Sequence, residues 1–67
     1  SIRQLIAKMR HDGMDVRSYE IKERRTSQGE FLEANLHLKV KRGSNDKLRV
    51  IDYMDQFTDV TISAAEV

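Results

Sequence analysis

A run of alternating apolar and polar residues, Glu30 to Lys41, constrains the fold of this 67-residue chain most. Aliphatic side chains occupy every second position of the run: Leu32, Ala34, Leu36, Leu38 and Val40. Successive side chains of a β-strand point to opposite faces, so this spacing predicts a strand with one apolar and one hydrated face. A helix would spread the same aliphatics around its circumference. We therefore expect a central strand on which the other elements pack.

The first residues predict an amphipathic helix over residues 2–12. Its apolar positions follow the i, i+3, i+4, i+7 rule of a helix that buries one face: Ile2, Leu5, Ile6 and Met9. Gly13 suits a left-handed residue after the helix end, and basic residues in the last turns suit the helix dipole.

A second extended stretch begins after Val16, with a bulge or late start expected near Arg17 because Val16 is out of step with Tyr19. Residues 25–29 form the predicted turn of a hairpin. A four-residue loop keeps the apolar faces together, whereas a slip by one residue opposes apolar and polar faces. This register predicts four cross-strand pairs: Arg25–Glu30, Lys22–Glu33, Ile21–Ala34 and Tyr19–Leu36.

A second helix is predicted over residues 46–57, capped by Ser44 or Asn45. Its expected inward stripe is Leu48, Ile51, Met54 and Phe57, with help from Val50. The alternation of Val60, Ile62 and Ala64 then predicts a last strand over residues 60–67.

The order α-β-β-α-β predicts an α+β, two-layer sandwich over a single domain, residues 1–67. It fits a ferredoxin-like fold if one central strand precedes residue 1. Three arrangements then remain open for the second edge of the long strand. The missing strand lies upstream in a larger protein, another chain supplies it, or the last strand pairs directly and in parallel with the long strand.

Composition narrows the class of protein. The chain has no cysteine, which excludes disulfides and thiolate metal sites. Twelve Lys and Arg residues against eleven Asp and Glu residues leave a net charge of +1, without the basic excess of a nucleic-acid-binding domain. No apolar run approaches the roughly 18 residues of a membrane span.

The element order, with the segments Gly13-Met14-Asp15-Val16 and Phe57-Thr58-Asp59-Val60-Thr61-Ile62, resembles an ACT domain. It is most similar to the cytosolic C-terminal domain of MgtC/SapB-type bacterial membrane proteins, and also to the ACT domain of RelA/SpoT-type nucleotide synthetases. The resemblance implies a regulatory module linked to magnesium homeostasis or, alternatively, an amino-acid-sensing domain of a metabolic enzyme. The family's ligand-binding loop joins its first strand to its first helix, so no ligand-binding residue can be carried onto this chain.

Candidate sites for chemistry are few. His11, Asp12 and Asp15 could form a hard metal site, but three polar residues around a helix end are more typical of a hydrated turn. The predicted register brings Ser18 beside His37, although no oxyanion loop accompanies this pair. We therefore expect no enzyme, with no catalytic, cofactor-binding or metal-binding residue.

A basic stripe on the hydrated sheet face could bind RNA: Lys22, Arg24, Lys39 and Lys41. Glu20 and Glu33 interrupt it, and Phe31 is the only aromatic residue expected there to stack on bases. Nucleic acid is therefore not an expected partner, and a small RNA-binding module is a further alternative.

The sequence thus predicts a non-catalytic regulatory or interaction domain. Its expected partners are a second copy, through the edge of the last strand, and the rest of a parent protein, including a membrane domain. The expected location is the cytoplasm, tethered to the inner membrane through the parent. The candidate interaction surface comprises Phe31, His37, Lys39, Val60 and Ile62.

Overall fold

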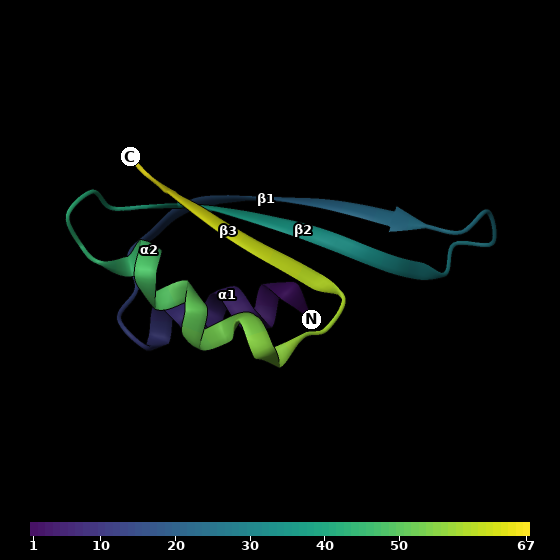
Figure 1. Ribbon diagram of the computed structural model, residues 1–67, viewed down its shortest axis with the longest axis horizontal. Coiled ribbons are helices and arrows are strands. Elements are labelled where there is room, and N and C mark those ends of the chain that lie inside the picture. The colour runs from purple at the N-terminus through teal and green to yellow at the C-terminus, as the bar shows by residue number, and fades with distance from the viewer.

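The computed structural model describes residues 1–67 as two helical segments packed on one face of a three-stranded sheet (Figure 1). The elements are α1 (Ile2–His11), β1 (Val16–Arg25), β2 (Phe31–Val40), α2 (Asp46–Arg49), the 3-10 helix η1 (Val50–Gln56) and β3 (Val60–Glu66). The order α-β-β-α-β and the α+β class follow the prediction. No helix has both the length and the apolar character needed to cross a membrane.

Helix α1 agrees with the predicted helix and has a capping motif at each end. The Ser1 hydroxyl accepts the Gln4 N–H, and the Gln4 side chain accepts a hydrogen bond from the Ser1 amine in return. After the last turn Gly13 adopts φ +93°, which glycine reaches without steric cost. The Gly13 N–H donates to the Arg10 carbonyl and the Met14 N–H to the Met9 carbonyl, the pair of bonds of a Schellman motif.

Strands β1 and β2 form the expected antiparallel hairpin, but the predicted register is wrong by two residues. Tyr19 pairs with Leu38 and Ile21 with Leu36, so Glu33 faces Arg24 instead of Lys22. An irregularity between Arg24 and Arg25 lengthens the loop beyond the predicted four residues. The expected bulge near Arg17 is confirmed by the register shift between Val16 and Ser18.

Strand β3 fills the second edge of β2 and runs parallel to it, from the Ala34–Val60 pair to the Val40–Glu66 pair. Of the three open arrangements, direct parallel pairing of the last strand is therefore the one adopted. The sheet order is β1-β2-β3, with the long strand in the centre as predicted.

The second helix differs from the prediction in both geometry and orientation. Only its first turn is α-helical, and the remainder is a 3-10 helix. The predicted inward side chains Leu48, Ile51 and Met54 are 68%, 62% and 42% exposed. Val50 and Tyr53 are buried instead, three residues apart, which matches the three residues per turn of a 3-10 helix.

The apolar core lies between the sheet and the helices. It contains side chains from all three strands and both helical segments: Leu5, Ile6, Met9, Met14, Val16, Leu36, Leu38, Val40, Val50, Tyr53 and Ile62. The molecule measures 42 × 20 × 16 Å, and the long dimension comes from the hairpin of β1 and β2, which extends past the helices (Figure 1).

Candidate functional site

The outer edge of β3 is a row of unpaired main-chain groups. At one end of the strand the Ala34 N–H donates to the Asp59 carbonyl, and at the other the Val67 N–H donates to the Val40 carbonyl, both at 2.9 Å. In a parallel ladder alternate residues direct both main-chain groups to the same neighbour. Residues 59, 61, 63, 65 and 67 therefore face β2. The N–H and C=O groups of Val60, Ile62, Ala64 and Glu66 point away from the sheet.

The two edge strands of the sheet differ in charge. Strand β1 carries six charged side chains in ten residues, whereas β3 carries only Glu66 in seven. Charged side chains on an edge strand oppose the addition of another strand, and lysine is especially effective. Strand β1 has this protection along its length and β3 lacks it. The edge of β3 is therefore the edge on which another strand can pair.

Three exposed apolar side chains on α2 and η1, Leu48, Ile51 and Met54, form a continuous row at a spacing of three residues. We name this row the η1 ridge. Contiguous apolar surface of this kind marks contact sites in proteins that are otherwise well folded.

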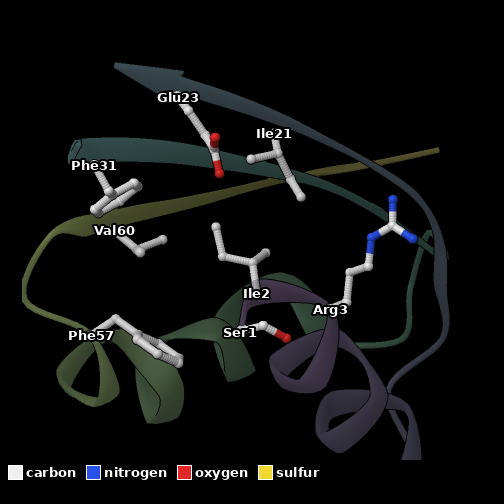
Figure 2. A pocket seen from close by; sticks show the side chains of 8 residues that line it. All are labelled: Ser1, Ile2, Arg3, Ile21, Glu23, Phe31, Phe57 and Val60. Atoms are coloured by element: carbon white, nitrogen blue, oxygen red, sulfur yellow. The ribbon is translucent and has the colours of Figure 1, made fainter. Parts of the chain in front are cut away.

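A pocket of about 400 Å³ opens between the N-terminal end of α1 and the projecting half of the sheet (Figure 2). Its lining is mainly apolar, and Arg3 and Glu23 are the charged members: Ser1, Ile2, Arg3, Ile21, Glu23, Phe31, Phe57 and Val60. Phe31 was expected on the hydrated face of the sheet, but it lies in this pocket together with Val60 (Figure 2).

The remaining predicted surface residues are divided between different places. His37 and Lys39 alternate with the buried residues of β2 and so lie on the open sheet face. The Ile62 side chain is in the core, so only its main chain is available for contact. The five predicted residues therefore do not form one surface.

The predicted pairing of Ser18 with His37 is wrong, because the two-residue change of register sets Ser18 opposite Lys39. His37 instead lies between Glu20 and Ser63, with its Nδ1 atom 2.8 Å from the Ser63 hydroxyl oxygen. Glu20 and Ser63 are exposed on an open face, and no hydrogen bond joins Glu20 to His37. This geometry links β2 to β3 and does not assemble a nucleophile with its base in an enclosed site.

A polar network that the sequence did not reveal joins the end of α1 to the second helix. The Tyr53 hydroxyl donates to an Asp12 carboxylate oxygen at 2.6 Å, and Arg49 donates to the Asp12 carbonyl at 2.7 Å. Asp46 is 3% exposed and accepts the Asp15 N–H at 2.8 Å. Burial, with the hydrogen bond to Asp12, raises the pKa of Tyr53 to about 12. These bonds fix the second helix in place.

Asp12 and Asp15, two of the three residues considered for a metal site with His11, take part in these contacts. Asp12 binds Tyr53, and Asp15 forms an ion pair with Arg17 at 2.9 Å. No three His, Cys, Asp or Glu side chains converge closely enough to hold a metal ion.

Two arginines near the tip of the hairpin are paired with carboxylates. Arg24 forms an ion pair with Glu33 at 2.8 Å and Arg25 with Glu23 at 3.0 Å. The Arg25 guanidinium also lies over the Phe31 ring, 5.7 Å from its centroid. In comparisons with protein-family models, curated proteins and solved structures, nothing matched this chain.

Proposed function

We propose that this chain is a non-catalytic interaction domain that self-associates through the free edge of β3. The observation that carries the proposal is the unprotected edge itself. Four residues direct unpaired N–H and C=O groups outward from a strand that bears one charge. Pairing of such an edge gives affinity through main-chain hydrogen bonds and needs no dedicated side-chain chemistry.

More specifically, we propose that the chain is a ferredoxin-like or ACT-like regulatory module of an MgtC/SapB-type membrane protein. In that reading it lies in the cytoplasm beneath a membrane domain. Its support is the order α-β-β-α-β with both helices on one face of the sheet. The link to magnesium homeostasis depends on the resemblance of the sequence.

A second candidate function is small-molecule sensing, which the pocket between Ile2 and Phe31 favours. A cavity of this size with an apolar lining and two charged side chains is typical of small-ligand sites. A panel of amino acids tested by thermal unfolding checks this function. A saturable rise in melting temperature that Phe57→Ala abolishes supports it, and an unchanged melting temperature across the panel counts against it.

A nucleic-acid partner is not part of the proposal. Arg24 of the basic stripe has a carboxylate partner, and Phe31 is directed into the pocket, so the open face offers no aromatic side chain on which a base could stack.

Self-association is tested by the molar mass across a wide range of concentration, measured by sedimentation equilibrium. We expect the mass to rise from 7.8 kDa towards twice that value. In Ala64→Pro the outward N–H is lost while the ladder to β2 is kept, so this variant stays monomeric and folded.

Ala65→Pro is the matched variant, because the N–H of residue 65 faces β2. It loses a ladder hydrogen bond and is expected to lower the free energy of unfolding. A wild-type protein that remains monomeric up to millimolar concentration contradicts the proposed function.

A further inference from the structure

The η1 ridge lies on the flank of the second helix that is remote from α1. Arg49 and Tyr53 both bind Asp12 at the end of α1, whereas Val50 is buried beneath the sheet. Successive residues of a helix are about 100 to 120° apart. Ile51, one step beyond Val50, therefore points away from α1. Leu48, near the end of α2, and Met54, in η1, stand three residues before and after Ile51, close to one helical turn, and so lie on the same side of the segment.

The ridge and the free edge of β3 are on the same side of the molecule. The segment α2–η1 packs against β3, while α1 packs against β1 (Figure 1). Strand β3 is also the last strand of the order β1-β2-β3. The apolar row is thus carried by the helical segment nearest to the unprotected strand edge, and one partner can cover both.

We propose that this partner is a second copy of the chain, related by a two-fold axis perpendicular to the sheet. The inference rests on the proposed function and specifies its geometry. Such an axis pairs β3 with β3 of the second copy in antiparallel orientation. All four outward residues form main-chain hydrogen bonds to the second copy when its Glu66 faces Val60 and its Ala64 faces Ile62. The axis then passes through Ser63.

The same axis brings the two helical layers together on one face of a six-stranded sheet. Segment α2–η1 lies beneath the sheet and runs opposite to β3 (Figure 1). A two-fold axis perpendicular to the sheet reverses every direction in the sheet plane, so the two helical segments are antiparallel and their η1 ridges meet. Lys47 stands near the start of the segment and Asp55 near its end. Antiparallel packing therefore places Lys47 of each copy near Asp55 of the other, and Glu66 faces an apolar residue. This charge complementarity favours a second copy as the occupant.

Single cysteines test the register, because the protein has no cysteine of its own. Residue 63 faces residue 63 of the second copy in a non-hydrogen-bonded pair. The Cα atoms of such a pair are about 4.5 Å apart, which is within the range of a disulfide. Mild oxidation is therefore expected to link Ser63→Cys into a covalent dimer. In Thr61→Cys the two thiols are four residues out of register, roughly 13 Å apart, and this control stays unlinked.

Ile51→Lys tests the ridge. We expect its dimer dissociation constant to rise by at least about tenfold, because a charge is added twice to an apolar contact. Leu32→Lys changes an exposed apolar residue in the hairpin and leaves the dissociation constant unchanged. Circular dichroism melts confirm that both variants fold.

The outcomes separate the geometry from the function. A dimer in which Thr61→Cys links as well as Ser63→Cys, or in which Ile51→Lys has no larger effect than Leu32→Lys, overturns this arrangement but keeps the proposed function. A wild-type mass that stays monomeric overturns both.

Discussion

The flank built from α1 and β1 leaves no large apolar side chain exposed, whereas the flank built from α2, η1 and β3 exposes Leu48, Ile51 and Met54. The first flank also has a charged edge strand and a helix with a capping motif at each end. The second has a nearly uncharged edge strand and a helix without a side-chain N-cap. The proposed self-association through the second flank depends on this difference.

The largest expected effect contrasts two isoleucines, one on each flank. Ile6 is 2% exposed in the core, so Ile6→Ala should lower the free energy of unfolding by about 2 to 5 kcal/mol. Ile51 is 62% exposed, so Ile51→Ala should change it by less than about 0.5 kcal/mol in the monomer. Urea unfolding at low protein concentration measures both. Equal losses would show that the ridge is packed within the monomer.

Asp46 joins the two flanks, and its removal should have the next largest effect. Asp46→Ala leaves the Asp15 N–H and the Arg49 guanidinium without their buried acceptor, which costs about 1 to 3 kcal/mol. Asp52→Ala, on the exposed side of η1, is the control and should remain within about 0.5 kcal/mol of the wild type. Urea unfolding measures the free energy of unfolding of both variants. A similarly small change in both would mean that the network does not hold the flanks together.

Tyr53→Phe should have the smallest effect on the free energy of unfolding near neutral pH. At alkaline pH, however, it should change how the stability depends on pH. Its folded-state pKa of about 12 exceeds the usual 10.0, so between these values the folded protein keeps a proton that the unfolded chain loses. The contribution is complete below pH 10 and is lost as the pH rises towards 12. Chemical unfolding from pH 9 to 12 should therefore show a steeper loss of stability in the wild type than in Tyr53→Phe. Parallel curves would disprove the buried hydrogen bond to Asp12.

The first flank was predictable from sequence because local rules determine it. In α1 the i, i+3, i+4 spacing, the glycine after the helix end and the inward apolar residues all favour one structure. The alternation of β2 is equally unambiguous, since any other conformation would mix its buried and exposed residues.

The hairpin register was not determined by the same information. A shift by two residues keeps every side chain on its face, so Ile21 meets an aliphatic partner whether it faces Ala34 or Leu36. The hydrophobic pattern excludes only odd shifts. The observed register is accompanied by an irregularity between Arg24 and Arg25, which no residue pattern marks.

The prediction of the second helix's orientation was wrong for a related reason. Two rows at a spacing of three residues compete for the core, one with Leu48 and Ile51 and the other with Val50 and Tyr53. Greater apolarity favours the first row. The second is buried because the Tyr53 hydroxyl reaches Asp12, forty-one residues earlier in the chain. The η1 ridge was missed as a consequence, because its residues were assigned to the core, whereas the edge of the last strand was proposed as a contact from the sequence.

Amide hydrogen exchange, resolved by residue and followed across protein concentration, tests the central claim most directly. The outward N–H groups of Ile62, Ala64 and Glu66 should exchange rapidly in dilute solution and become protected as the concentration rises. The edge amides of β1 should keep their rates. Protection that appears along β1, or an increase in molar mass without any protection along β3, would contradict the assignment of β3 as the contact edge.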